Sequence, residues 1–295
     1  MDKLIRGMAA DGTVRVLAAI TTDITAEAIR RHQPSPTVSA ALGRIMTGTL
    51  LLASTLKDFE RVTAKIECDG PVGGIIAEAT AAGGVRGWVK NPLAELPVRP
   101  DGKFDVAGII GHGMFHIIRE AGSNVGLRGE PYIGSVPITS GEIAEDFAYY
   151  LAKSEQIPSA VMLGVLLQNT EPFVAASGGV LVQVMPGANE HVLTMIEDTI
   201  AHAPNLTAVI KEGATPTDLL KIVLGVIDFE VMEEKPVIFK CNCSQERAAE
   251  TIAALGHDEV SEMRLTDKGA SMTCGFCNET YVLGEDDLRR LLETI

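Results

Sequence analysis

The chain has 295 residues, of which 46% are hydrophobic and 22% charged, and its net charge is −14. This is the composition of a globular protein that buries a core without disulfide staples, and its acidic balance argues against DNA, RNA or an anionic membrane as main partners. The first residues lack a long apolar stretch, and no apolar run is long enough to span a bilayer. We therefore expect a cytosolic protein whose thiols are kept reduced.

The first two thirds of the chain alternate predicted strands with helices. One helix starts at Ser35-Pro36, with serine as N-cap and proline at the first helical position, and is expected to run to about Lys57. Shorter helices are predicted over residues 25–32 and 140–154. Strands are predicted over residues 14–22, 61–68, 73–79, 85–89, 112–119, 130–138, 160–167 and 179–185. Strands paired as antiparallel meanders with segregated helices indicate an α+β domain that ends near residue 187.

Three features of this part resemble functional sites but favour structural roles. Cys68 falls on the apolar face of its strand, where a cysteine acts as a small buried hydrophobe. Gly70, Gly73 and Gly74 match no phosphate-binding pattern and indicate turns. His112, His116 and Glu120 would share a face only on a helix, whereas on the predicted strand the histidines lie too far apart for one metal.

The segment 188–231 carries helix signals and almost no strand pattern. One helix presents an apolar stripe that includes Val192, Ile196 and Ile200, and another follows a capping box at Thr215. The second helix carries Leu219, Leu220 and Val223 and is apolar almost all the way round, so something must cover it. Either the segment packs permanently on the first domain, or it is a removable cover over a binding surface.

Four of the five cysteines lie in the last part of the chain, residues 232–295. Cys241 and Cys243 form a C-x-C pair, and Cys274 and Cys277 form a C-x-x-C pair thirty residues further on. Four thiolates supplied as two close pairs are typical of a tetrahedral zinc site, and Gly275 is expected to supply a positive φ in the second turn. The sequence therefore predicts one zinc ion per chain.

Four interpretations of the cysteines compete: a structural zinc knuckle, a nucleic-acid-binding ribbon, a redox switch and a thioredoxin-type enzyme. This part of the chain has more acidic than basic side chains, which argues against the ribbon. The enzyme is disfavoured because the motif lies outside any βαβ pattern. No nucleophile elbow, zincin motif or nucleotide loop occurs elsewhere, and a shell of four thiolates leaves no open position for substrate.

The remaining tail pattern predicts helices and a hairpin around the cysteines. Ser244 caps a helix that turns Ala248, Ile252 and Leu255 inward and stops at Gly256. A further helix is expected over residues 259–265, a strand over 280–282 and a last helix from residue 285. Pro236 is expected to act as a hinge, and His257 is not needed as a ligand because the cysteines complete the shell. The predicted domains are thus 1–187, 188–231 and 232–295.

At this point the chain resembles a known family. Its C-x-C and C-x-x-C pairs resemble the redox switch of the heat-shock protein 33 family of bacterial chaperones. The resemblance covers essentially the whole chain, and further matching segments are 35–36 with 42–44, 69–71, 85–92 and 154–158.

The resemblance implies an ATP-independent holdase, not an enzyme, that is inactive when reduced and zinc-bound. On oxidation Cys241 pairs with Cys243 and Cys274 with Cys277, zinc leaves, and the tail and helical linker unfold. The oxidised form then dimerises and binds unfolding client proteins. The stripe residues Val192, Ile196, Ile200, Leu219, Leu220 and Val223 are candidate client-binding residues.

Two alternatives remain beside this hypothesis. A constitutive zinc-stabilised interaction protein would keep its metal in mild peroxide. A thiol-disulfide oxidoreductase would turn over a small disulfide substrate and would lose that activity with Cys274→Ser.

Overall fold

The computed structural model describes residues 1–56, 59–121 and 131–295. It divides into two compact units, residues 1–240 and 241–295, and each is described by itself. The division into three domains at residues 187 and 231 stays a prediction.

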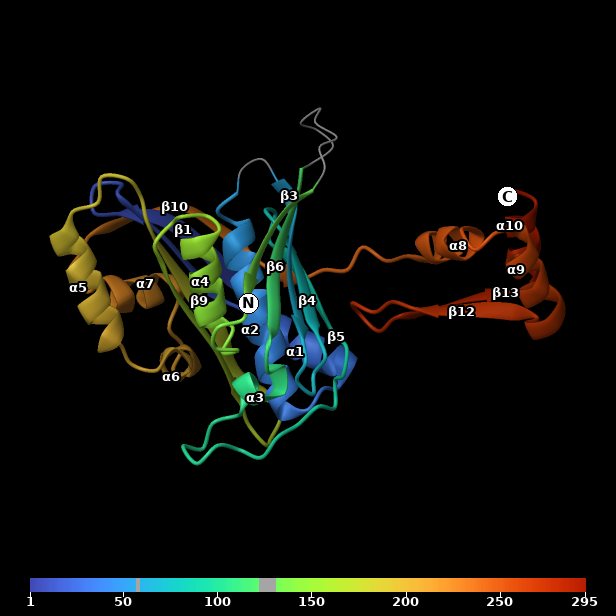
Figure 1. Cartoon of the computed structure of the whole chain (residues 1–295), viewed down its shortest axis with the longest axis horizontal. Helices are drawn as coiled ribbons and strands as arrows, with labels where there is room; N and C mark the ends of the chain where they lie inside the picture. The colour runs from blue at the N-terminus through green and yellow to red at the C-terminus, as the bar shows by residue number, and fades with distance from the viewer. Residues whose placement is uncertain (57–58, 122–130) are drawn as a thin grey trace. The chain divides into compact units, whose positions relative to one another are not determined.

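The first unit contains two sheets (Figure 1). The five-stranded sheet is antiparallel throughout, in the order β10-β1-β2-β9-β8. Its strands are β1 (Lys3–Ala9), β2 (Val14–Ile20), β8 (Ser159–Leu167), β9 (Val174–Val184) and β10 (Phe229–Pro236).

The six-stranded sheet has the order β11-β5-β4-β3-β6-β7, and only its short β11 runs parallel to its neighbour. Its strands are β3 (Phe59–Cys68), β4 (Ile75–Thr80), β5 (Gly84–Val89), β6 (Gly113–Ala121), β7 (Tyr132–Pro137) and β11 (Ile238–Phe239). Antiparallel sheets with helices packed on them confirm the predicted α+β class.

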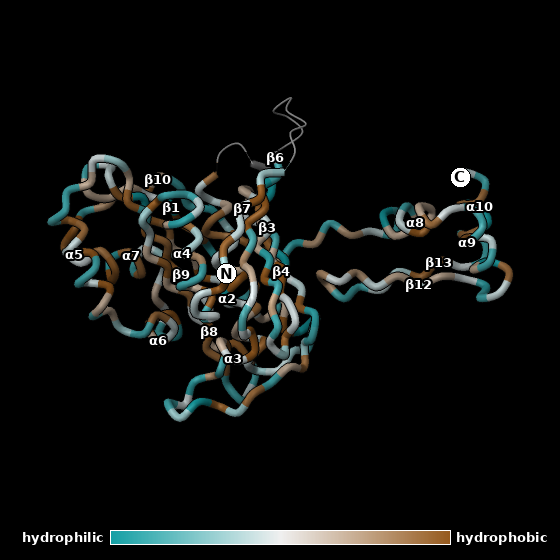
Figure 2. Tube along the Cα trace, in the orientation of Figure 1, coloured by the Kyte–Doolittle hydropathy of each residue, from teal (hydrophilic) through white to brown (hydrophobic). Residues whose placement is uncertain are grey.

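Helices fill the space between the two sheets. The long α2 (Pro36–Ala53) packs against strands of both, together with α1 (Thr22–His32) and α4 (Ala144–Lys153), while the short α3 (Val106–Ile110) contacts α2. The main core lies here, and Figure 2 shows hydrophobic residues concentrated along these elements. The predicted cap is present, because the side chain of Ser35 accepts a hydrogen bond from the backbone N–H of Val38.

A second core lies on the opposite face of the five-stranded sheet. Three helices cover this face: α5 (Glu190–Ala201), α6 (Leu206–Lys211) and α7 (Pro216–Leu224). We call them the helical cover. Their apolar side chains pack with those of β1, β2 and β9 into one cluster. In this structure the helical cover therefore packs on the five-stranded sheet of the first unit.

The chain between the helical cover and the cysteines is tied to both sheets in turn. β10 pairs with β1 at the edge of the five-stranded sheet, and β11 then pairs with β5 of the other sheet. The backbone N–H of Lys240, next to Cys241, still donates to the carbonyl of Val85 over 2.9 Å. Residues 229–240 therefore connect Cys241 along the chain to the helical cover.

The second unit is a hairpin with helices around it. The strands β12 (Gly269–Thr273) and β13 (Thr280–Gly284) pair antiparallel. Around them lie α8 (Gln245–Ala253), α9 (His257–Glu262), a π-helical turn (Met263–Asp267) and α10 (Glu285–Leu292). The capping of α8 by Ser244 and the return strand at residue 280 are as predicted.

Several predicted boundaries were wrong for local reasons. α2 ends at Ala53, where the N–H and hydroxyl of Thr55 both close onto the carbonyl of Leu52. α4 starts at Ala144 rather than at Ser140, because the carboxylate of Asp146 accepts the backbone N–H groups of Thr139, Ser140 and Ile143.

Two side chains are more exposed than predicted. Leu255 lies beyond the last turn of α8 and is 52% exposed, not turned inward. Cys68 is half-buried at the end of β3, where it packs against the main core. Between the predicted strands 112–119 and 130–138 the sequence also indicates a turn at residues 122–124, which lies outside the described residues.

The buried carboxyl of Asp2 predicts a pH dependence of stability. It is 2% exposed, and its Oδ2 accepts the backbone N–H of Ile24 over 2.8 Å, which caps α1 from outside the helix. Burial raises the pKa of Asp2 from 3.8 to about 6. The hydrogen bonds from the backbone N–H groups of Asp23 and Ile24 act in the opposite direction but are outweighed. Because the folded state holds this proton more tightly, the stability it contributes is complete below about pH 4 and is lost as the pH rises through about 6.

We therefore expect Asp2→Asn to remove this pH dependence while keeping an oxygen acceptor for the N–H of Ile24. We compare the free energy of unfolding of the variant with that of the wild type at each pH. Between pH 4 and pH 7.5 this difference should move in favour of the variant by at most about 3 kcal/mol. Thermal unfolding of both reduced proteins at the two pH values measures the difference. Parallel pH profiles for the two proteins would refute this account of Asp2.

Candidate metal centre

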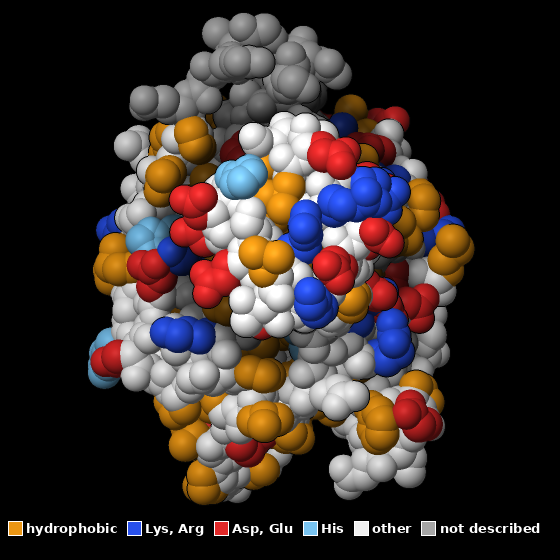
Figure 3. All heavy atoms as spheres, turned by 90° about the vertical axis from the view of Figure 1, so that its right-hand side faces the viewer, with side chains coloured by type: hydrophobic (Ala, Val, Ile, Leu, Met, Phe, Trp, Pro, Cys, Tyr) orange, Lys and Arg blue, Asp and Glu red, His pale blue; other side chains and the backbone are white. Residues whose placement is uncertain are grey.

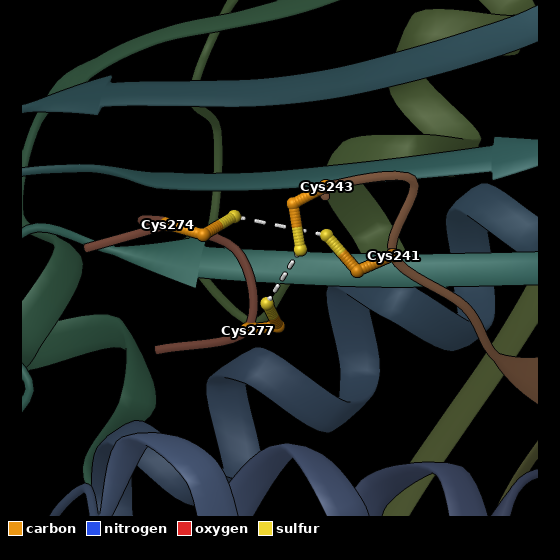
Figure 4. Close-up of side chains that lie close together, drawn as sticks. All are labelled: Cys241, Cys243, Cys274 and Cys277. Atoms are coloured by element: carbon orange, nitrogen blue, oxygen red, sulfur yellow. Dashed lines mark hydrogen bonds between the residues drawn. The ribbon is translucent and has the colours of Figure 1, made fainter. Parts of the chain in front are cut away.

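The structure brings the four tail cysteines together although thirty residues separate the pairs. All four Sγ atoms lie within 4.8 Å of one another. Two contacts between sulfurs join Cys241 to Cys274, at 3.7 Å, and Cys243 to Cys277, at 3.2 Å, and both cross from one pair to the other (Figure 4). None of the five cysteines, all of which lie within the described residues, forms a disulfide.

The first pair is held by the start of α8. The side chain of Ser244 accepts the N–H of Arg247, and the guanidinium of Arg247 donates back to the carbonyl of Asn242 over 2.8 Å. The residue between the two cysteines is thereby anchored to the helix that follows them. Two sulfurs on this short loop consequently face the same point.

The second pair sits in the loop that joins β12 to β13. The N–H of Cys274 donates to the carbonyl of Glu279, and the N–H of Asn278 donates to the carbonyl of Cys274, at 2.9 and 2.8 Å. Asn278 has a φ of 60°, whereas Gly275 is not among the residues with positive φ, so the prediction for Gly275 was wrong. The left-handed residue that closes the turn is an asparagine, which tolerates this conformation better than most residues.

The sulfur spacing fits one tetrahedrally bound metal ion. A metal–sulfur bond of roughly 2.3 Å places tetrahedral sulfurs roughly 3.8 Å apart. The observed contacts of 3.2 and 3.7 Å and the outer limit of 4.8 Å bracket this spacing. Cys277 is 3% exposed and the other three are half-buried, so the sulfurs are mostly shielded from water. These four cysteines can therefore hold one metal ion.

The surroundings of the second pair both oppose and favour thiolates. Burial raises the pKa of the Cys274 and Cys277 thiols above the ordinary value. In the opposite direction, the backbone N–H groups of Phe276 and Cys277 donate to Cys274, and that of Glu279 donates to Cys277. A bound cation adds the largest favourable charge and deprotonates such thiols outright. The site thus suits a metal far better than it suits four isolated thiolates.

One neighbour of the site escaped the sequence reasoning. The phenol of Tyr281, on β13, donates a hydrogen bond to the Sγ of Cys243 over 3.0 Å. The sequence placed this residue on the return strand of the hairpin but gave no reason to link it to a cysteine. The link depends on how the loop before α8 packs against β13, which sequence reasoning left open.

The other residues considered as ligands lie elsewhere. His112 is exposed next to Asp69, and His116 bonds Ser135 across the sheet. His257 lies at the start of α9 beside Asp258. Within residues 1–56, 59–121 and 131–295, no second group of three or more His, Cys, Asp or Glu side chains is placed to hold a metal.

The candidate client-binding residues are buried in this structure. Ile196, Leu219, Leu220 and Val223 belong to the core under the helical cover, and Val192 and Ile200 pack against it half-buried. They are therefore not available for binding while the helical cover is in place.

The surface carries no dominant charge of one sign on the face drawn in Figure 3, where acidic and basic side chains are mixed with hydrophobic ones. Among the described residues, none of the helices is both long and apolar enough to cross a bilayer.

Comparisons with known proteins agree along the whole chain. The model of the family described as Hsp33 protein matches residues 2–284. A protein named 33 kDa chaperonin from Desulforamulus reducens is 43% identical over 294 residues, which cover 100% of this chain and 98% of the relative. One of the same name from Thermus thermophilus is 44% identical over 306 aligned positions, which cover 100% of this chain and 88% of the relative.

A solved structure has a similar fold. The crystal structure of a 33 kDa chaperonin, a heat shock protein 33 homologue from Thermotoga maritima, superposes with a TM-score of 0.90 at 36% identity. The superposition covers 99% of this chain and 98% of the chain from Thermotoga maritima. Sequence and structure together show that this chain belongs to the Hsp33 family.

Proposed function

We propose that this protein is an ATP-independent holdase chaperone whose activity is controlled by oxidation of Cys241, Cys243, Cys274 and Cys277. The observation that carries the proposal is the cluster of four sulfurs in a chain whose relatives are named 33 kDa chaperonin. It is not an enzyme in this account, since a closed shell of four thiolates leaves no position for a substrate.

In the reduced state the four cysteines bind one Zn²⁺ per chain. Zinc is favoured over other metals because it accepts four sulfur donors in tetrahedral geometry and has no redox chemistry of its own. Bound there, it supplies the charge that keeps the cysteines deprotonated. The chain contributes the two loops, the N–H donors to Cys274 and Cys277, and the phenol of Tyr281.

Peroxide oxidation then converts the ligands into disulfides. One thiolate attacks peroxide, forming an S–O bond while the O–O bond breaks, and after uptake of a proton it leaves a sulfenic acid and water. A second thiol displaces that oxygen as water and forms the S–S bond. Two peroxide molecules, each accepting two electrons, thus yield two disulfides, whose sulfurs no longer bind zinc as thiolates.

We expect these disulfides to join Cys241 to Cys243 and Cys274 to Cys277. The sulfur contacts of 3.7 and 3.2 Å run across the pairs, so trapping these two contacts would give the other pairing. Within-pair bonds are expected because only sequence neighbours stay close once the tail unfolds, and closing a short loop costs little entropy. Peptide mapping of the oxidised protein decides, and a majority of cross-pair disulfides would contradict this order of events.

Loss of zinc is expected to unfold residues 241–295 and to loosen the helical cover. The unit has a small core of five fully buried residues, Ala248, Ile252, Val260, Leu283 and Leu288, besides Cys277. In small zinc sites the metal contributes on the order of 10–16 kcal/mol, which so small a core does not replace. We expect the disturbance to pass along residues 229–240. The first strand on this path, β11, is held to β5 by only two residue pairs and should detach easily.

Displacement of the helical cover would expose the client-binding surface. Four of its side chains, Ile196, Leu219, Leu220 and Val223, are buried, and burial of such groups stabilises the covered state by roughly 1.5–3 kcal/mol each at most. Once uncovered, the same area favours contact with apolar segments of unfolding proteins. Two uncovered surfaces can also meet, which accounts for a homodimer in the oxidised state.

The net charge of −14 supports action on protein clients and not on nucleic acid or anionic membranes, and the cytoplasmic location expected from the sequence is part of the same proposal. The direct test is light scattering of a heat-aggregating client mixed with reduced, zinc-loaded protein or with peroxide-treated protein. We expect suppression of aggregation by the oxidised form alone. Equal suppression of aggregation by both forms would favour the constitutive zinc-stabilised interaction protein. If neither form suppresses aggregation, the proposal of a chaperone is wrong.

A further inference from the structure

Tyr281 is placed against a ligand sulfur by the hairpin itself. It stands opposite Met272 in the β12–β13 ladder, and its ring packs with Met272 and Ala270 against the small core of the second unit. This packing fixes the phenol, whose hydroxyl donates to the Sγ of Cys243 over 3.0 Å. The contact therefore depends on the hairpin and on the loop before α8 that carries Cys243.

Such a hydrogen bond changes what the sulfur can do. A donor to a thiolate takes up part of its negative charge and engages the lone pair that would otherwise attack peroxide. Groups in the outer shell of a metal site orient the ligands and tune their reactivity in this way. The donors to Cys274 and Cys277 identified above are backbone N–H groups, which only a substitution by proline would delete, with a change in the loop backbone. Tyr281 is a side chain, so its effect can be removed without disturbing the loop.

We propose that Tyr281 is a positioning residue that restrains Cys243: it holds this sulfur as a metal ligand and slows its attack on peroxide, so that oxidation starts at another cysteine. This inference rests on the proposed function, because it concerns the oxidation of the same four cysteines. The restrained step is the attack of the Cys243 thiolate on peroxide. In that step an S–O bond forms, the O–O bond breaks, the sulfur gives two electrons to peroxide, and water leaves after uptake of one proton.

The test compares Tyr281→Phe with the wild type in the full-length, reduced, zinc-loaded protein. Phenylalanine keeps the ring and its packing and deletes only the hydroxyl. We expect zinc release by peroxide, followed with a chromogenic chelator, to be about three- to tenfold faster in the variant, the range that corresponds to loss of one ordinary hydrogen bond. Sulfenic acids trapped by dimedone and mapped at early times should show a larger share at Cys243.

A matched control removes a hydroxyl from the adjacent residue of the same strand. The hydroxyl of Thr280 bonds that of Thr273, on the facing strand, over 2.9 Å, whereas the hydroxyl of Tyr281 bonds a sulfur. Thr280→Val should therefore leave the rate of zinc release and the pattern of trapped sulfenic acids unchanged. With Co²⁺ in place of zinc, the sulfur-to-metal charge-transfer band should shift in Tyr281→Phe and not in Thr280→Val.

The outcomes separate this inference from the function beneath it. If the wild type releases zinc on oxidation and Tyr281→Phe does so at the same rate with the same dimedone pattern, Tyr281 serves only packing and the inference fails alone. If peroxide releases no zinc from the wild type, the proposed switch fails and the restraint fails with it.

Discussion

Replacement of Cys277 by serine is expected to abolish zinc binding and to leave residues 241–295 unfolded even under reducing conditions. Cys277 is the most buried of the four cysteines, and its Sγ lies 3.2 Å from that of Cys243. A serine hydroxyl is too short to reach the same point and is not deprotonated at neutral pH, so the shell keeps three thiolates. Because metal binding and folding of such a site are one event, the loss of affinity appears as loss of structure.

The functional consequence is a chaperone that no longer needs peroxide. Reduced Cys277→Ser should suppress client aggregation about as well as the oxidised wild type, while its zinc content falls below the wild-type value after dialysis against a chelator. Cys68→Ser is the matched control, because Cys68 lies in the first unit at the end of β3. It should leave zinc content and switching unchanged. A folded Cys277→Ser with one zinc per chain would contradict the account of the site.

Replacement of Gly7 by alanine is expected to activate the chaperone with zinc still bound. Gly7 sits at the bulge where β1 pairs with β10, and an added Cβ would overlap the carbonyl oxygen of Glu230. The two strands must separate locally, which costs about 1–3 kcal/mol by the usual penalty for overpacking. Since β10 connects the helical cover to the tail, its detachment should loosen the cover directly and bypass the cysteines.

Activity in the reduced, zinc-loaded Gly7→Ala protein is measured by the same aggregation assay, with zinc content confirmed in the sample. The control is Gly113→Ala, whose Cβ would overlap the carbonyl oxygen of Glu67 across the β6–β3 pairing of the other sheet. It imposes a comparable strain away from β10 and should lower the melting temperature without activation. Equal activity in the two variants would mean that general destabilisation, not release of β10, exposes the surface.

The sequence was informative where a pattern is local. The paired cysteines, the caps at Ser35 and Ser244, and the alternating strand that ends at Cys68 all depend on residues a few positions apart. Cysteines close in sequence need only short loops to face one point, so their meeting could be anticipated. The long buried helix was likewise legible from its cap and its small apolar residues.

The strands β1 and β10 were missed because their pairing is not a local property. β10 contains several charged residues, as an exposed edge strand should, and so it lacks the apolar alternation that marks a half-buried strand. Gly7 interrupts β1 at the point where the backbone of β10 comes closest. The hydrogen bond from Tyr281 to Cys243 likewise depends on how the loop before α8 packs against β13. Each of these features links distant residues through geometry that only the fold supplies.

The most direct test of the central claim is amide hydrogen exchange before and after peroxide oxidation, with zinc release followed in the same sample. The account predicts that protection is lost over residues 241–295 and over α5, α6 and α7, while β3, β4 and β6 keep theirs. Full protection of α5, α6 and α7 in an oxidised protein that binds clients would contradict it, because the surface beneath the helical cover could then not be the one that clients bind.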